Sequence, residues 1–300
     1  MHLIHNLSSN YPLFGLFISL LLFLGLNQLG SLICKNKDIN NIITEVSDPE
    51  YQKVLIAVNC VMIFLFPIFL FYKFSTELIL LLTLILIVLG VIQLFIFLQR
   101  YQFYIGIIKK QKLENLVIVI FLITYFTLSM APITHADALG YHEVVARFIA
   151  DNRTFPKELN NFQNLLAGSG EVMMSLSFLF NSEQLGNLIQ YSGLLSIVGV
   201  IRKNSNNKLL FSLLVLSTPV IIFLCSSPKP QLFPLASNIL IFTIIFFNKA
   251  TSIIHKKNLT YLTIIILTFL INSINTKFSF MLSGVILYLL SVNYFFKKSF

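Results

Sequence analysis

The densest group of chemically capable side chains lies at residues 135–142, directly after an apolar run. This segment contains His135, Asp137, Tyr141 and His142. If it is helical, Asp137 and Tyr141 lie four residues apart on one face, with His142 beside them. A carboxylate at the edge of a lipid layer can act as a general base, because partial desolvation raises its pKa. The alternative is that Asp137 only caps the N-terminus of the following helix.

Charged side chains further along are also open to two interpretations. Glu171 begins a short apolar segment, where it is either a second catalytic acid or a favourable anion at a helix N-terminus. Glu143, Arg147 and Asp151 are spaced as ordinary i, i+4 pairs on a solvated face. Arg147 and Glu143 remain candidates for contacting a substrate.

The sequence gives little support for a metal or a disulfide. His135 and His142 are seven residues apart, a spacing that matches no common ligand motif. The three cysteines are not arranged as a CxxC pair, and each lies in or at the end of an apolar run: Cys34, Cys60 and Cys225. We therefore expect no cofactor, with a divalent metal as the open alternative, and His135 is kept as a candidate substrate contact.

Two cations stand alone in short connections on the side where Asp137 is expected. Lys229 lies in the proline-broken hairpin 226–231, and Lys277 lies in the turn 275–278. Each is either an anchor that reaches the water phase from a helix end or a cation for a phosphate group. A lipid phosphate would suit such a face, because its head group needs cations and its tail needs the bilayer.

The composition indicates which elements must carry these side chains. Of 300 residues, 56% are hydrophobic and only 11% are charged, whereas a soluble domain averages roughly 25% charged residues. This excludes a soluble enzyme, a secreted disulfide scaffold and a nucleic-acid-binding protein. A spanning helix needs about 20 apolar residues, and nine runs approach that length: 12–34, 54–72, 77–98, 116–131, 183–201, 209–225, 232–247, 259–274 and 278–296. We expect an all-α, polytopic transmembrane helix bundle that forms one domain over residues 1–300.

The basic residues predict the direction of the bundle, because cytoplasmic loops accumulate Lys and Arg. Alternate loops contain 15 of the 21 basic residues, and the complementary loops contain 6. This split predicts an N-terminus outside and a C-terminus in the cytoplasm. Asp137, Lys229 and Lys277 then all lie outside.

The longest polar interruption, residues 132–182, is predicted to be an outer loop between the fourth and fifth spans. Within it, residues 136–152 are expected to form an amphipathic helix on the membrane surface. The segment 171–180 is too short to span, so it either dips into the interface or packs on the bundle. The apolar stripe of the surface helix consists of Tyr141, Val144, Val145, Phe148 and Ile149.

Three short motifs occur in a suggestive order. They are Asp-x-Leu-x-Tyr-His at 137–142, Ser-Ser-Pro-Lys at 226–229 and Thr-Lys-Phe at 276–278. This order resembles the membrane glycosyltransferases of the GT-C fold, in particular bacterial proteins related to lipid-linked-sugar mannosyltransferases. The resemblance covers about half of the chain, from residue 131 to about residue 280.

The resemblance implies a hexosyltransferase that takes its sugar from a polyprenyl-phosphate donor on the outer, periplasmic face of a bacterial inner membrane. Asp137 would be the general base for the acceptor hydroxyl, and Tyr141 and His142 would hold Asp137 or the donor phosphate. Lys229 and Lys277 would lie near the donor phosphate. The implied mechanism is an inverting displacement in which the lipid phosphate leaves.

Two other functions remain open. The first is a non-catalytic membrane carrier or assembly partner, and the second is an outer-polysaccharide polymerase or ligase. Carriers commonly place ionisable groups near the bilayer midplane, and none of the nine predicted spans has a charged residue near its middle. This favours a site at the outer interface. The expected partners are the lipid donor and the bilayer, without nucleic acid, and the sequence gives no oligomeric state.

Overall fold

The structure is a computed structural model, and it describes residues 12–71, 75–102, 113–156, 167–247 and 256–299. Within these ranges every regular element is a helix, which confirms the all-α prediction. The helices are α2 Pro12–Ile33, α3 Lys37–Val46, α4 Pro49–Phe71, α5 Thr76–Gln99, α7 Leu113–Ser129, α8 Glu143–Asn152, α9 Ser169–Phe178, α10 Leu185–Asn204, α11 Lys208–Leu216, α12 Pro219–Cys225, α13 Leu232–Phe247, α14 Lys256–Thr276 and α15 Met281–Ser299. Two short turns complete the set, the π-helical η1 Ala138–His142 and the 3₁₀ turn η4 Phe278–Phe280.

Among the residues that the structure describes, three helices, α2, α4 and α5, are long and apolar enough to cross a membrane. Helices α11 and α12 pass the same test together, as a pair bent by 64°. Shorter apolar helices lie at 115–129, 232–246, 260–276 and 278–294. A helix or bent pair therefore stands at each of the nine predicted spans, and nine full crossings remain a prediction.

The bend between α11 and α12 differs from the single straight span predicted for residues 209–225. Pro219 is the first residue of α12, and Thr218 before it has an extended backbone with ψ of 121°. A residue that precedes proline is pushed out of the helical region, and proline has no N–H to continue the helix. The apolar pattern alone does not reveal this interruption.

Helices α2 and α5 cross at very short range. A Cβ on Gly25 would overlap the backbone carbonyl of Leu86, and one on Gly90 would overlap that of Leu21. Only glycine permits backbones to approach this closely in a helix pair. These two glycines fix the crossing point of the N-terminal helices.

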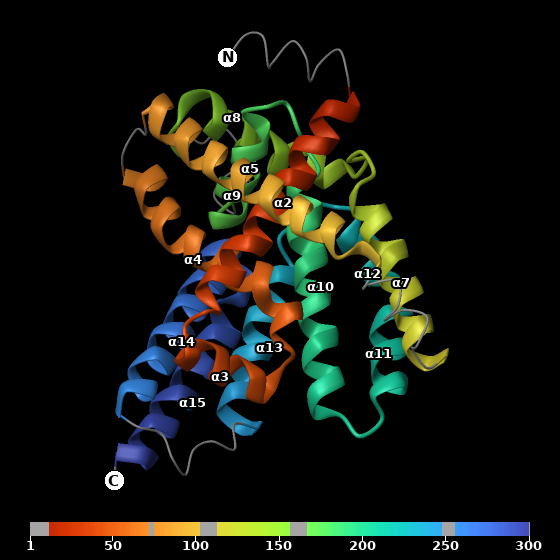
Figure 1. Cartoon of the computed structure of the whole chain (residues 1–300). Helices are drawn as coiled ribbons and strands as arrows, with labels where there is room; N and C mark the ends of the chain where they lie inside the picture. The colour runs from red at the N-terminus through yellow and green to blue at the C-terminus, as the bar shows by residue number, and fades with distance from the viewer. Residues whose placement is uncertain (1–11, 72–74, 103–112, 157–166, 248–255, 300) are drawn as a thin grey trace.

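The chemically interesting segments lie at one end of the bundle (Figure 1). Helices α8 and α9 lie at the end where α2 begins, whereas α3 and the connection between α10 and α11 lie at the opposite end. The basic residues Arg202, Lys203 and Lys208 are thus far from the segment that carries Asp137. This separation agrees with the predicted sorting of charge, and the membrane side that each end faces remains a prediction. Lys109, Lys110 and Lys112, which also entered that prediction, lie outside the described residues.

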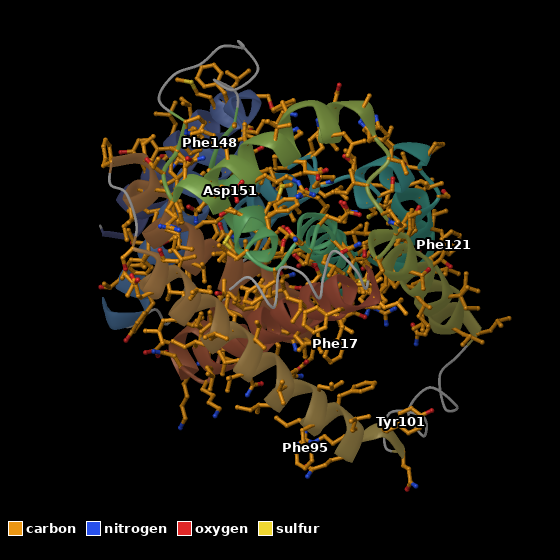
Figure 2. The ribbon with its side chains drawn as sticks, turned by 90° about the horizontal axis from the view of Figure 1, so that it is seen from above. Phe17, Phe95, Tyr101, Phe121, Phe148 and Asp151 are labelled. Carbon is orange, nitrogen blue, oxygen red and sulfur yellow. The ribbon has the colours of Figure 1, made fainter. Side chains whose placement is uncertain are left out.

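Helix α8 presents a different face to the bundle from the one predicted. Val145 and Ile149 are buried, but Val144 and Phe148 are 53% and 38% exposed, and Glu143 is only 7% exposed. The predicted solvated position of Glu143 is therefore wrong, and only part of the predicted apolar stripe packs against the bundle. The π-helical turn η1 ends directly before α8, so residues 138–142 do not continue the single helical register assumed from residue 136. Figure 2 looks down on this end, with Phe148 and Asp151 labelled on α8 and Phe95 and Tyr101 at the margin of the molecule.

Helix α9 packs inside the bundle, the second of the two arrangements considered for the segment 171–180. All ten of its residues are buried, and it contacts α8, α4 and α14. Helix α9 also contacts α10, α2 and α5, so it is enclosed by the bundle on several sides.

Candidate functional site

Asp137 and Lys229 form an ion pair between two segments that are distant in sequence. Lys229 Nζ lies 2.7 Å from Asp137 Oδ2. Asp137 is in the connection after α7, and Lys229 is in the hairpin between α12 and α13. The Lys229 side chain is 18% exposed and that of Asp137 is 53% exposed, so the pair is open to water on the Asp137 side.

The hairpin that carries Lys229 is held by a residue that the sequence did not single out. Gln190 on α10 accepts hydrogen bonds at its Oε1 from the backbone N–H groups of Gln231 (3.0 Å) and Phe233 (3.2 Å). The ammonium of Lys229 lies 5.8 Å from the ring centroid of Phe223. Both interactions restrict where Lys229 can reach.

Lys277 belongs to the same charged group. Burial is the main cause that lowers the pKa of Lys277, and the nearby positive charge of Lys229 lowers it further. The negative charges of Glu171 and Asp137 act in the opposite direction. We call Asp137, Lys229 and Lys277 the lysine–carboxylate cluster, because Lys229 is bonded to Asp137 and the charges of both act on Lys277.

The ion pair controls how strong a base Asp137 is. The hydrogen bond from Lys229, followed by its charge, lowers the pKa of Asp137 below the ordinary aspartate value. The backbone of Asp137 is helical and its side chain makes no capping hydrogen bond. The prediction that Asp137 only caps a helix is therefore wrong, because its carboxylate is used by Lys229.

His142 and Glu171 form a second, buried pair directly behind the cluster. His142 Nδ1 lies 2.5 Å from Glu171 Oε1 in a hydrogen bond, and the two side chains are 1% and 0% exposed. Glu171 Oε2 accepts a hydrogen bond of 2.6 Å from the backbone N–H of Gly168. Both oxygens of this carboxylate are thus used inside the protein, which extends the predicted role of Glu171 at the N-terminus of α9.

Tyr141 lies against His142, with 3.8 Å between the ring centroids. Burial is the main cause that raises the pKa of the Tyr141 phenol well above its usual value, and the charges of Glu171 and Asp137 raise it further. Tyr141 therefore stays protonated at neutral pH and can act only as a neutral donor or acceptor.

Arg147 and Glu143 lie in a separate group with Glu183. Arg147 pairs with Glu143 Oε1 at 2.7 Å, and its guanidinium lies 4.7 Å from the ring centroid of Phe178. Burial raises the pKa of Glu183, and the charge of Glu143 adds to that effect. The sequence placed Glu183 only at the start of a span, so this group could not be recognised from spacing.

His135 stacks edge-on against Phe223, with 4.2 Å between ring centroids. Its Nδ1 is buried and has no hydrogen-bond partner among the described residues. Within the described part of the chain, no group of three or more His, Cys, Asp and Glu side chains lies close enough to hold a metal ion.

Comparison with known proteins gives one family match. The model described as the DUF1420 N-terminal domain matches residues 100–297 of this chain. No curated protein and no solved structure matches it. The matched segment includes all the residues of the lysine–carboxylate cluster and the His142 and Glu171 pair.

Proposed function

The chain belongs to the DUF1420 N-terminal domain family, and we propose that the cluster carried by the segment shared with that family is the active site of a membrane glycosyltransferase. Its donor is a sugar linked to a polyprenyl phosphate, and its acceptor is a hydroxyl of a lipid, glycan or protein. The site faces the periplasmic side of a bacterial inner membrane, with the N-terminus outside and the C-terminus in the cytoplasm. The observation that carries the proposal is the ion pair of Asp137 with Lys229, two residues whose charges also act on Lys277.

The two lysines supply the charge that a phosphate leaving group needs. The positive charge of Lys229 acts on Lys277, and the negative charges of Glu171 and Asp137 act on Lys277 in the opposite direction. A phosphate placed between the two lysines would offset the effect of one positive charge on the other and gain charge-assisted hydrogen bonds. The same contacts would stabilise the phosphate as the bond to the sugar breaks.

Asp137 is proposed as the general base. The acceptor hydroxyl attacks the anomeric carbon and gives its proton to the Asp137 carboxylate, while the bond from that carbon to the phosphate oxygen breaks. The polyprenyl phosphate leaves with the bonding electrons, and the configuration at the sugar carbon inverts. Asp137 is 53% exposed, so an acceptor can reach it from the water side.

The ion pair suggests an order of events. While Lys229 is bonded to Asp137, the carboxylate is a weak base, since its pKa is lowered. A donor phosphate that takes hydrogen bonds from Lys229 would release Asp137 and restore its basicity. The base is then strongest when the donor is in place.

The proposal is tested by offering labelled polyprenyl-phosphate sugars to the full chain in lipid and comparing it with Asp137→Asn. Asp151→Asn is the matched control, because Asp151 is an exposed carboxylate on the neighbouring helix α8. We expect a fall of about 100-fold or more in transfer for Asp137→Asn and no change for Asp151→Asn. Equal transfer by both variants would remove Asp137 from the mechanism.

A non-catalytic lipid-phosphate carrier or assembly partner is the second candidate. The observation in its favour is that the carboxylate required as the base is already engaged by Lys229. Such a protein would bind polyprenyl phosphate without transferring a sugar. Release of free lipid phosphate from a labelled donor therefore separates the two functions, and the polymerase or ligase alternative differs from the first only in its acceptor.

A further inference from the structure

The N-terminal turn of α9, residues 168–171, contacts each of the segments that carry the lysine–carboxylate cluster. Glu171 binds His142, which lies five residues after Asp137. Ser169 Oγ lies 2.9 Å from Thr276 Oγ1, and Thr276 immediately precedes Lys277. Both hydroxyls are completely buried.

The glycines of the turn bring it against the remaining segments. A Cβ on Gly170 would lie 2.9 Å from Pro230 Cβ, and Pro230 immediately follows Lys229. A Cβ on Gly168 would overlap the backbone carbonyl oxygen of Asn275, at the end of α14. Any side chain at these positions would push the two lysine-bearing segments away from the turn.

The turn cannot take part in the chemistry directly. Glu171 is 0% exposed, and its two oxygens accept hydrogen bonds from His142 and Gly168. Ser169 is also 0% exposed and is bonded to Thr276. Neither side chain can touch a substrate in this arrangement.

We infer that the turn Gly168–Glu171 is a positioning element, which sets the separation of Asp137, Lys229 and Lys277 through His142, Pro230 and Thr276. Ser169 and Glu171 are its positioning residues, and Glu171 is thereby not a catalytic acid. The part of this inference that concerns catalysis, the effect of the turn on the rate of sugar transfer, rests on the proposed function. The effect of the turn on the placement of Lys277 does not depend on the proposed function.

Ser169→Ala tests the inference without a large change in volume. Ser175→Ala is the matched control, because Ser175 is also buried in α9 but bonds only to the carbonyl of Val172 in its own helix. The first readout is the pH profile of Lys277 acylation by an amine reagent in the full chain in lipid, quantified by mass spectrometry, with the exposed Lys208 as the internal reference.

The expected result follows from what now surrounds Lys277. Burial and the charge of Lys229 lower the pKa of Lys277, against the opposing charges of Glu171 and Asp137. If Ser169→Ala releases Thr276, Lys277 moves into water and away from Lys229, so its pKa rises. Its labelling below that pKa then slows by roughly threefold, while Ser175→Ala leaves the profile unchanged.

The second readout is sugar transfer, which we expect to fall about tenfold in Ser169→Ala, because a small misplacement of reacting groups is costly. Thr276→Ser keeps the hydroxyl and should retain the wild-type labelling profile, whereas Thr276→Val should reproduce the shift. An unchanged Lys277 profile in both Ser169→Ala and Thr276→Val would overturn the positioning role. If the wild-type chain transfers no sugar, the proposed function fails, and the labelling comparison still decides the role of the turn.

Discussion

Asp137 and Lys229 lie 92 residues apart in the chain and meet in an ion pair with 2.7 Å between Oδ2 and Nζ. The contact joins the connection after α7 to the hairpin between α12 and α13. It places a carboxylate beside the cation that lowers its pKa. The chemistry proposed for this end of the molecule depends on that relationship.

Lys229→Gln should make Asp137 a stronger base. Removing the hydrogen bond and charge of Lys229 raises the pKa of Asp137 toward its ordinary value. A general base must be deprotonated, so the acid limb of the pH profile of kcat/KM for the donor, which reports the donor-free protein, should move to higher pH, with a lower maximum value. Lys208→Gln, at the opposite end of the bundle, is the control. An acid limb that stays in place would mean that another group titrates in the reaction.

Glu171→Ala should strongly destabilise the protein. It leaves His142 Nδ1 and the backbone N–H of Gly168 without their buried acceptor, at a cost of about 2–4 kcal/mol. Glu171→Gln keeps an acceptor oxygen, so its free energy of unfolding should fall by less than that of Glu171→Ala. Thermal unfolding in detergent measures the difference against Glu50→Ala, which removes an exposed pair with Lys53 worth at most about 1 kcal/mol. Equal melting temperatures for Glu171→Ala and Glu50→Ala would contradict the buried pairing.

Gly25→Ala should loosen the crossing of α2 and α5. The added Cβ would overlap the carbonyl of Leu86, and forcing a methyl group into a packed contact costs about 1–3 kcal/mol. Gly140→Ala is a suitable control, because a Cβ at Gly140 meets no atom within 4 Å. Thermal unfolding of both variants in the same detergent makes the comparison. A Gly25→Ala protein as stable as Gly140→Ala would argue against this crossing.

Arg147→Met should affect stability more than activity. Arg147 pairs with the largely buried Glu143 and lies over Phe178. Because the Arg147 side chain is 47% exposed, its replacement should lower the free energy of unfolding by about 1 kcal/mol. Sugar transfer measured well below the melting temperature should stay within about twofold of wild type. A large loss of transfer with unchanged stability would instead restore Arg147 as a substrate contact.

The sequence predicted the helices well because each of them is marked by a long apolar run. Apolar runs near the length of a span locate the nine main helical segments with errors of a few residues. The π-helical turn at 138–142 and the bend at Pro219 were missed. Each depends on a local backbone change of one or two residues, which the periodicity of a whole segment averages out.

The sequence predicted part of the site, because charged side chains form a pattern along the chain that can be sorted by side. Sorting charge by side brought Asp137, Lys229 and Lys277 to one face, and Lys229 and Asp137 do meet. The spacing rules for α8 failed at Glu143, which is buried although its spacing placed it on the solvated side of the helix. The contacts of Gln190 and Ser169 involve residues 41 and 107 positions away, and neutral polar side chains give no charge pattern from which such contacts could be inferred.

The most direct test of the central claim is the affinity of the purified chain in lipid for a polyprenyl phosphate without a sugar. Lys229→Gln and Lys277→Gln should each weaken binding about tenfold or more, because each removes one charge-assisted hydrogen bond to the phosphate. The two control variants, Lys203→Gln and Lys208→Gln, change lysines at the opposite end of the bundle. Each should bind the lipid phosphate like the wild type. Unchanged affinity in Lys229→Gln and Lys277→Gln would contradict a phosphate site at these two lysines.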